Sequence, residues 1–284
     1  STSARMPSIE WECRTARESY LDQVAALLRH IQRGDIYEVN YCIKRVAKDP
    51  GFDPFISFER LMRNTDAPFA GFLRMGDRFA LCMSPERFLN FRGGKVKGEP
   101  MKGTRRRGVD PAEDDLMKHE LQNDPKERSE NIMAVDVMRN DLSQVAAPNS
   151  VQVTELCAVR TYPKVHQMVT TIEADLQPAR SQFDAVRAAF PMASMTGAPK
   201  YRAMQLIEAA EDQQRGLYSG TMGFFAPDGT ADLNVVIRTV LFNASSGELS
   251  LSTGSALTAL CDPQQEWEEC EVKALSVINA LADA

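Results

Sequence analysis

The sequence predicts an α+β fold with largely antiparallel sheets, and three observations support that prediction. Stretches with the two-residue period of strands occur in runs, stretches with helical period separate those runs, and strict strand–helix alternation is absent. The 284 residues are 43% hydrophobic and 25% charged, so they suffice for a large core. No repeat or composition break divides the chain. We therefore expect one domain over residues 1–284.

The first half of the chain is expected to hold a helix, a run of strands and a second helix. Apolar residues recur at helical spacing from Tyr20 to Ile31, and Gly34 then provides a helix end. Alternating apolar and polar residues follow, and glycine-containing turns interrupt them. A charged and then amphipathic stretch closes this half. The predicted elements are a helix over 17–33, a strand over 35–47, strands within 69–100 and a helix over 110–141.

The second half has a similar order of elements. Runs of β-branched residues predict strands, and a short helix then ends before Pro191. Pro199 suits the first turn of another helix. An alternating stretch with turns at 227–229 and 245–247 precedes a strong final helix. The predicted elements are strands within 151–176, helices over 181–189 and 199–210, strands within 216–257, and a helix after Asp262–Pro263.

Charge and composition argue against several classes of protein. The formal net charge is −6, whereas proteins that bind nucleic acid or anionic membranes are usually basic. Only three histidines occur, and no HExxH motif is present, which argues against a zinc enzyme. There is no 18-residue apolar span and no signal peptide. We therefore expect a cytoplasmic protein with no nucleic-acid or membrane partner.

Two pairs of glutamates have the spacing that places side chains on one helix face. Glu127 and Glu130 form the first pair, and Glu266 and Glu269 form the second. If the two helices face each other, four carboxylates converge, and Mg²⁺ prefers such oxygen ligands. From the spacing alone, a solvated helix face is the more common explanation. Lys273, four residues after Glu269, is either a helix ion pair or a cation for a carboxylate ligand.

Further residues are candidates for binding an anionic ligand, and each also has an ordinary structural explanation. Thr196 and Gly197 precede a helix start, where backbone N–H groups suit an anion or merely begin the helix. Arg238 lies in a β-branched run and needs a carboxylate, either structural or from a substrate. The segment Gly254–Ser255–Ala256 is either a close backbone approach to a ligand or a turn. Tyr218 is either a ligand contact or a core aromatic.

Lys102 raises the question of what it does in the segment EPMKGT, directly before the cationic run RRRG. A turn with a solvated basic tail is one explanation. The other is a lysine that is kept neutral and directed at a substrate, since the like charges of Arg105–Arg107 and a nearby divalent cation would lower its pKa. A bound anionic substrate would raise that pKa, and the sequence does not decide between these effects.

Taken together, the ordered motifs of the chain resemble those of the chorismate-binding enzymes. This family includes the large subunits of anthranilate synthase and aminodeoxychorismate synthase and the isochorismate and salicylate synthases. The resemblance extends from about Ile31 to the C-terminus and implies antiparallel sheets packed as a sandwich with helices outside. The matching segments are GDIYEVN, SPERFL, EPMKGTRRRG, ERSENIMAVDVMRNDL, YPKVHQMV, MTGAPKYRAMQLIEAAE, LYSGTMGF, LNVVIRT and DPQQEWEECEVKA.

The resemblance assigns roles to the candidate residues. Magnesium would be held by two glutamates, with a second pair in support, and the ring carboxylate of chorismate would join its ligands. The pyruvyl carboxylate would be gripped by an arginine and a tyrosine, and a lysine and backbone N–H groups would hold the carboxylates. The residues are, for the metal, Glu130 and Glu269 with Glu127 and Glu266, and for the substrate, Arg238, Tyr218, Lys273, Thr196, Gly197, Gly254, Ser255 and Ala256.

The resemblance also implies a reaction. Family members that form anthranilate typically carry alanine at the position of Lys102, whereas the aminodeoxychorismate synthases carry this lysine in a P-I-K-G-T motif, here PMKGT. The lysine attacks ring carbon 2 while the carbon-4 hydroxyl leaves, and ammonia then adds at carbon 4 and expels the lysine. Glu86 matches the general acid, which needs a raised pKa. The product, 4-amino-4-deoxychorismate, leads toward p-aminobenzoate and folate.

Departures from the family pattern leave alternatives open. Gln167 stands where a histidine tied to pyruvate release is usual, and Glu38 stands where the isochorismate and salicylate branches have a water-activating lysine. Gln167 argues against a reaction that eliminates pyruvate, and Glu38 argues against a reaction in which water attacks the ring. The usual N-terminal region is expected to be missing, and ammonia is expected from a separate glutamine amidotransferase subunit. The alternatives are an anthranilate or 2-amino-2-deoxyisochorismate synthase, and a catalytically silent chorismate-binding module.

Overall fold

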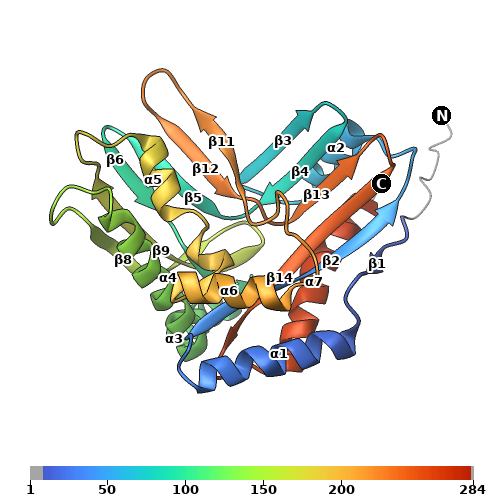
Figure 1. Cartoon of the computed structure of the whole chain (residues 1–284), viewed down its shortest axis with the longest axis horizontal. Helices are drawn as coiled ribbons and strands as arrows, with labels where there is room; N and C mark the ends of the chain where they lie inside the picture. The colour runs from blue at the N-terminus through green and yellow to red at the C-terminus, as the bar shows by residue number, and fades with distance from the viewer. Residues whose placement is uncertain (1–8, 283–284) are drawn as a thin grey trace.

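The computed structural model describes residues 9–282, and this part of the chain forms two seven-stranded antiparallel sheets with seven α-helices (Figure 1). It confirms the predicted α+β class, whereas the single-domain prediction stays a prediction. The first sheet has the order β1 (Glu12–Cys13), β2 (Glu38–Lys48), β14 (Glu248–Thr258), β13 (Thr239–Asn243), β4 (Arg78–Ser84) and β3 (Phe69–Met75), with β10 (Gly197–Ala198) paired to β2.

The second sheet contains the segment with the candidate lysine. Its order is β11 (Thr221–Phe225), β12 (Ala231–Val235), β5 (Arg87–Arg92), β6 (Lys95–Gly98), β9 (Val165–Asp175) and β7 (Met101–Arg106), with β8 (Gln152–Thr161) paired to β9. Strand β7 therefore lies at an edge, where one residue can leave the regular register.

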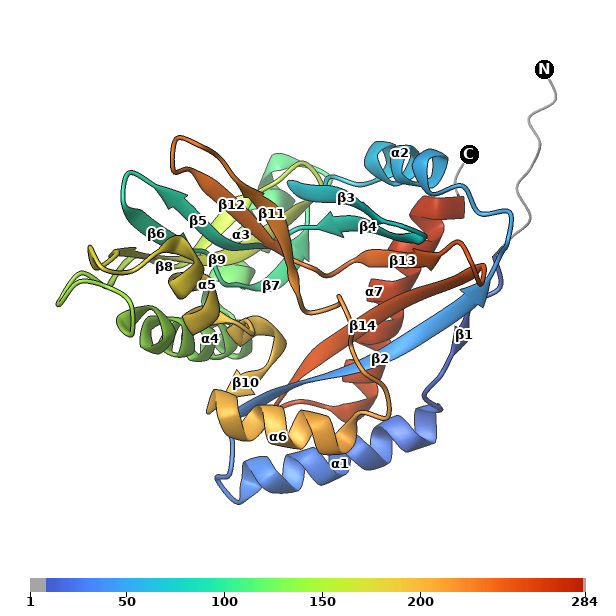
Figure 2. The ribbon, with the colours of Figure 1, turned by 45° about the horizontal axis from the view of Figure 1, so that its top comes forward.

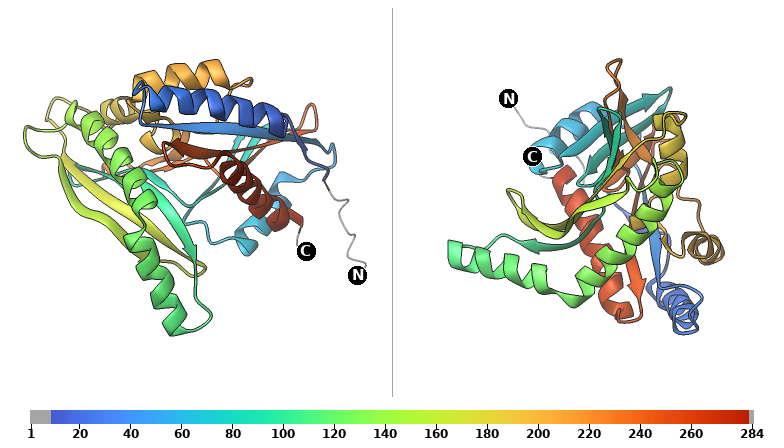
Figure 3. Two further views of the ribbon diagram at one scale, coloured as in Figure 1. Left: turned by 90° about the horizontal axis from the view of Figure 1, so that it is seen from below. Right: turned by 90° about the vertical axis from the view of Figure 1, so that its left-hand side faces the viewer.

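The helices cover the two sheets separately. On the first sheet, α7 (Pro263–Ala282) packs against β14 between α1 (Arg17–Gln32) and α2 (Pro54–Asn64). Helix α6 (Lys200–Ala210) lies beside α1, and apolar residues of both helices share one core cluster (Figure 2). On the second sheet, α3 (Pro111–Asn123) and α4 (Pro125–Ser143) follow one another (Figure 3). The short helix α5 (Gln182–Ala189) packs on α4, and a 3₁₀ turn over Ala193–Met195 follows it.

Two parts of the helix prediction are wrong. The helix expected over 110–141 is two helices, because Asp124 accepts hydrogen bonds from the N–H groups of Lys126 and Glu127, and Pro125 occupies the first turn of α4. Helix α2 was not predicted, although Asp53 caps it in the same way and Pro54 begins it. Both starts have the same signal, an aspartate followed by proline.

A separate finding concerns membranes. None of the helices in residues 9–282 combines the length and the apolar character that crossing a bilayer requires.

Candidate active site

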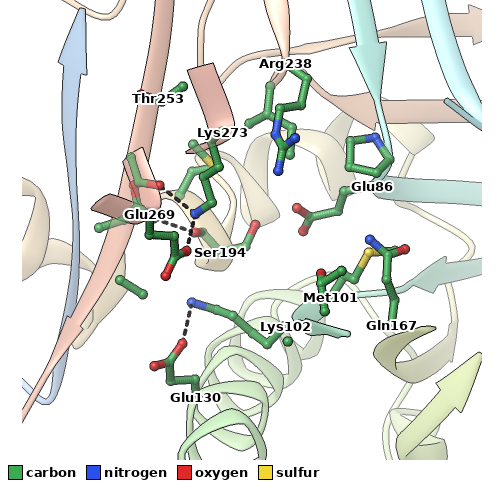
Figure 4. A pocket seen from close by; sticks show the side chains of 18 of the residues that line it. Glu86, Met101, Lys102, Glu130, Gln167, Ser194, Arg238, Thr253, Glu269 and Lys273 are labelled. Carbon is green, nitrogen blue, oxygen red and sulfur yellow. Dashed lines mark hydrogen bonds and ion pairs between the residues drawn. The ribbon is translucent and has the colours of Figure 1, made fainter. Parts of the chain in front are cut away.

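A cavity of about 500 Å³ lies between the two sheets and is bounded by α4 and α7 (Figure 4). Strand β7 supplies Lys102 from one side, and the facing helices supply the two glutamate pairs. Strand β14 forms a further wall. The cavity contains most of the side chains that the sequence singled out, namely Lys102, Glu86, Glu127, Glu130, Glu266, Glu269, Lys273, Arg238, Tyr218, Gly254 and Ala256.

Three predicted binding residues do not line this cavity. The Thr196 hydroxyl donates to the carbonyl of Met192 at 2.9 Å. Gly197 pairs with β2, and a Cβ added there would lie 2.1 Å from the Glu38 carbonyl oxygen, so glycine is required by backbone packing. Ser255 is fully buried, and its hydroxyl lies 3.1 Å from that of Tyr20. The structure gives these three residues structural contacts, and a ligand role for them stays a prediction.

Lys102 is aimed into the cavity by an irregularity in β7. The register with β9 shifts between Lys102 and Thr104, and Gly103 at the bulge has φ +75°. A Cβ at Gly103 would lie 2.9 Å from a Glu127 carboxylate oxygen and 2.9 Å from Leu121. This position therefore favours glycine for its conformation, and a side chain there would displace the Glu127 end on α4 and the Leu121 end on α3.

The amino group of Lys102 is held by carboxylates. Its Nζ donates to Oε1 of Glu38 at 2.6 Å and lies 3.6 Å from Oε2 of Glu130. Only 10% of the Lys102 side chain is exposed. Burial lowers the pKa of this lysine, but Glu38 and Glu130 together outweigh burial and raise the pKa above its usual value. The carboxylates therefore hold Lys102 as a buried ammonium group.

The carboxylates, and not the neighbouring arginines, decide the direction of the shift in the Lys102 pKa, which is upward. Each arginine pairs with an acidic residue that flanks or belongs to α3. As a result, their charges are neutralised locally, and the carboxylates around Lys102 determine its protonation. The three pairs are Arg105 with Asp124, Arg106 with Glu113, and Arg107 with Asp114.

Glu86 is a buried carboxyl on the loop between β4 and β5, with 6% of the residue exposed. Burial raises the pKa of Glu86 to about 7, and the Ser194 hydroxyl and the charge of Lys102 only partly offset that rise. The neighbouring Arg87 does not neutralise Glu86, because it makes two 2.9 Å hydrogen bonds with Asp232 instead. Glu86 can therefore carry a proton near neutral pH.

The four glutamates converge from α4 and α7, but lysines pair with three of them. Lys126 lies 3.0 Å from Glu266, Lys273 lies 2.5 Å from Glu269, and Lys102 contacts Glu130. Within residues 9–282 no group of three or more Asp, Glu, His or Cys side chains is already arranged around a metal position. In Figure 4 the Lys102 amino group points into the space between Glu130 and Glu269.

The donor chemistry nevertheless suits a hard divalent cation. Oε1 of Glu130 is buried and accepts no hydrogen bond from the part of the chain that the structure describes. Burial raises the pKa of Glu130 to about 7 and also raises those of Glu127 and Glu266, as expected for carboxylates that lack sufficient positive charge. At Glu269 burial acts in the same direction, but Lys273 outweighs it and lowers the pKa. A cation with oxygen ligands would satisfy this cluster. Magnesium itself stays a prediction.

Arg238 and Tyr218 also line the cavity. Arg238 is not in a strand as predicted, but between β12 and β13 with φ +51°. Its guanidinium group points into the cavity above Glu86 (Figure 4) and donates to the Ser276 hydroxyl at 2.9 Å. No carboxylate within residues 9–282 forms an ion pair with it. Tyr218 is buried, with its hydroxyl 3.7 Å from Sγ of Cys42. Arg238 is therefore available for an anionic ligand.

The sequence did not identify several residues that line the cavity. Lys126 had a detectable signal, since it lies four residues before Glu130 on the same helix face. The contact between Glu38 and Lys102 had none, because β2 and β7 belong to different sheets. Ser194 also gave no signal, yet it lines the cavity, and within residues 9–282 its buried hydroxyl has no hydrogen-bond partner of normal geometry.

Comparison with known proteins agrees with this arrangement. Residues 1–279 match the chorismate binding enzyme family. The chain is 43% identical over 275 residues to aminodeoxychorismate synthase of Streptomyces griseus, covering 96% of this chain and 38% of that protein. It is 38% identical to aminodeoxychorismate synthase component 1 of Klebsiella aerogenes, with coverages of 95% and 59%.

A solved structure shows the same fold. Anthranilate synthase component I of Streptococcus pneumoniae superimposes with a TM-score of 0.88 at 26% identity, covering 98% of this chain and 61% of that one. The chain thus spans between about two fifths and three fifths of the length of these relatives. The matched sequence, the shared sheets and the acidic cavity lead to one conclusion: the chain belongs to the family of chorismate-binding enzymes.

Proposed function

We propose that the chain is the synthase part of an aminodeoxychorismate synthase, which converts chorismate and ammonia to 4-amino-4-deoxychorismate. The observation that carries this proposal is Lys102, a buried amine directed into a cavity that also holds a protonatable acid and Arg238, which has no carboxylate partner within residues 9–282. The Streptomyces and Klebsiella relatives bear the corresponding names. Gln167 also supports amination without loss of pyruvate, since an amide cannot act as an acid near pH 7.

In the proposed first step, Lys102 acts as a nucleophile. The ammonium group must first lose a proton, and Glu38 at 2.6 Å is the nearest acceptor. The neutral amine then bonds to ring carbon 2, the ring double bond shifts, and the carbon-4 hydroxyl takes the proton of Glu86 and leaves as water. The substrate is now covalently attached to Lys102, and Glu86 is a carboxylate.

The second step reverses the attachment. Ammonia bonds to carbon 4, the double bond shifts back, and the bond between carbon 2 and the Lys102 nitrogen breaks. One proton from the new ammonium group restores Glu86, and the proton on Glu38 returns to the released Lys102 amine. The sum is chorismate plus ammonia giving 4-amino-4-deoxychorismate plus water. A difficult displacement at carbon 4 is thereby divided into two allylic steps.

The remaining residues would bind and orient chorismate. Arg238 and Tyr218 would hold the pyruvyl carboxylate, and Lys273 with the backbone of β14 at Gly254 and Ala256 would hold the ring side. Glu130 and Glu269, supported by Glu127 and Glu266, would bind Mg²⁺, which supplies a counter-charge for the ring carboxylate. In this proposal, these contacts would place carbon 2 toward β7 and carbon 4 toward Glu86.

The proposal includes a partner. The Klebsiella relative is named component 1, which implies a second component for that enzyme. For this chain we propose a glutamine amidotransferase subunit that supplies ammonia, with the product used toward p-aminobenzoate and folate in the cytoplasm. Free ammonium at high concentration would replace the partner in a test with the chain alone.

Product identification tests the proposal. The chain is incubated with chorismate, Mg²⁺ and ammonium, and the products are identified by mass and fluorescence. We expect 4-amino-4-deoxychorismate without pyruvate. Fluorescent anthranilate with stoichiometric pyruvate, or 2-amino-2-deoxyisochorismate, would assign the chain to the other amination reactions. Chorismate binding without turnover would indicate a silent binding module.

A further inference from the structure

A buried polar cluster lies behind the Lys102 strand and outside the cavity. It consists of Asn131 on α4, Thr170 on β9 and Cys157 on β8, which are 0%, 0% and 1% exposed. Its surroundings are apolar, because Cys157 packs with Leu121 and Met168 in a small core cluster. Polar side chains in such a position need a complete set of hydrogen bonds.

The hydrogen bonds of this cluster lead to Pro100, the residue directly before β7. The carbonyl oxygen of Pro100 accepts from Nδ2 of Asn131 and from the backbone N–H of Thr170, each at 3.2 Å. The Thr170 hydroxyl donates to Oδ1 of Asn131 and accepts from the backbone N–H of Cys157 at 2.9 Å. The amide of Asn131 is therefore fixed in orientation by Thr170, and it in turn fixes Pro100.

This arrangement connects the backbone next to Lys102 with the helix that carries Glu130. Pro100 is two residues before Lys102, and Asn131 directly follows Glu130. Successive residues on a helix point about 100° apart, so Glu130 faces the cavity while Asn131 faces the sheet. The hydrogen bond between Asn131 and Pro100 thus ties α4 to β7 next to the 3.6 Å contact between Lys102 and Glu130.

We infer that Asn131 is a positioning residue, which sets the placement of Lys102 relative to the carboxylates of α4, and that Thr170 orients the Asn131 amide for this purpose. The inference rests on the proposed function for its kinetic consequence. Lys102 must reach one ring carbon, and a displacement of about 1 Å can lower a rate by about 100-fold. A cluster that only stabilised the fold would have no such effect on the folded enzyme.

Two test variants and two controls test the inference. Asn131→Asp keeps the shape of the side chain but removes the donor to Pro100. Thr170→Val removes the hydroxyl that orients the amide, and Thr170→Ser retains it. The control is Asn90→Asp on β5, where the same kind of side-chain amide donates to a backbone carbonyl, that of Ala231 at 3.0 Å, and the side chain does not line the cavity.

Two readouts are measured on each purified variant. The first is kcat and KM for chorismate with saturating ammonium. The second is the rate at which a small acylating reagent modifies Lys102, quantified by peptide mass spectrometry, which requires no turnover. For Asn131→Asp we expect kcat to fall between about 10- and 100-fold with little change in KM, and the labelling rate of Lys102 to change. Thr170→Val should show a smaller effect, and Thr170→Ser and Asn90→Asp should match the wild type.

A lower melting temperature for Asn131→Asp with unchanged kcat and unchanged labelling would overturn the inference. If Asn131→Asp does not fold, the inference is tested by comparing Thr170→Val with Thr170→Ser in the same two readouts. A wild type that makes no 4-amino-4-deoxychorismate would refute the proposed function. The labelling comparison would still test the position of Lys102 in that case, so the two failures are distinguishable.

Discussion

The amino group of Lys102 on one sheet lies 2.6 Å from the carboxylate of Glu38 on the other, across 64 positions of sequence. This contact explains how a lysine can be buried beside a cavity without losing its charge. It also means that the reactive form of Lys102 depends on a residue outside its own motif.

The variant Glu38→Gln should therefore make Lys102 more reactive at lower pH. The Glu38 carboxylate favours the charged form of the lysine, so replacing it with a neutral amide lowers the pKa of Lys102. The measurement is the pH dependence of Lys102 acylation by mass spectrometry. We expect the midpoint to move down in Glu38→Gln. An unchanged midpoint would show that Glu38 does not control this amine. Asp175→Asn, which removes the exposed partner of Lys95, serves as the control and should leave Lys102 unchanged.

The raised pKa of Glu86 gives a prediction about pH. The carboxyl has a pKa of about 7 in the fold against an ordinary value of 4.5, so the folded state binds more protons than the unfolded state between these pH values. Stability contributed by this group is present below pH 4.5 and is lost as pH rises through 7. Glu86→Gln should therefore gain stability over the wild type across this range, by up to about 3 kcal/mol.

The same variant should lose activity, because a glutamine cannot donate the proton that the leaving hydroxyl needs. In the wild type, kcat should fall as pH rises above about 7, where Glu86 loses its proton. Urea unfolding measured from pH 5 to 9 checks the predicted change in stability. Product formation measured over the same range checks the predicted change in activity. A wild type whose activity rises steadily over that range would contradict the assignment of Glu86 as the acid.

A side chain at Gly103 is predicted to strain the backbone and to displace the ends of the Glu127 and Leu121 side chains. Alanine there would require φ +75° and would place Cβ 2.9 Å from the Glu127 carboxylate. Gly94→Ala is the matched control, since Gly94 has φ +78° but nothing lies within 4 Å of its Cβ position. Both variants should lose about 1 to 3 kcal/mol of stability from backbone strain. Only Gly103→Ala should also lose activity, measured as kcat per folded molecule. Equal activities in the two variants would contradict the role of the bulge.

The acidic cluster predicts a dependence on Mg²⁺. Removing divalent cations with a chelator should abolish product formation, and Mg²⁺ should restore it. Glu130→Gln should weaken Mg²⁺ binding by about 10-fold or more in titration calorimetry, because it removes a charged oxygen ligand. Asp136→Asn on the exposed face of the same helix is the control and should bind Mg²⁺ like the wild type. Full activity in the presence of chelator would contradict the metal assignment.

Much of the fold and site follows from local sequence signals. Residues that are close in sequence produce the helix pattern from Tyr20 to Ile31, the alternation after Gly34 and the glutamate pairs. Helix or strand geometry then determines which side chains share a face. The ordered motifs identified the family, and the resemblance to that family suggested roles for individual residues that their spacing alone does not indicate. Lys102 and Glu86 in one cavity follow from that combination.

The rest depends on contacts between distant segments. Glu38 and Lys102 come from different sheets, and Arg105–Arg107 are neutralised by partners on and around α3, so the sequence misjudged the charge around the lysine. Ser255 faces Tyr20 rather than the cavity, because a single step along a strand reverses the side chain. Tertiary packing determines these contacts, and local sequence patterns carry no information about it.

The covalent attachment of substrate to Lys102 is the central claim, and intact-protein mass spectrometry tests it most directly. The chain is mixed with chorismate and Mg²⁺ without ammonia, quenched, and digested to locate any adduct. We expect an added mass of one chorismate less one water on the peptide that contains Lys102, and its loss when ammonium is added. Lys102→Ala should give no adduct and no 4-amino-4-deoxychorismate. A Lys102→Ala enzyme that still forms this product at the wild-type rate would contradict the account.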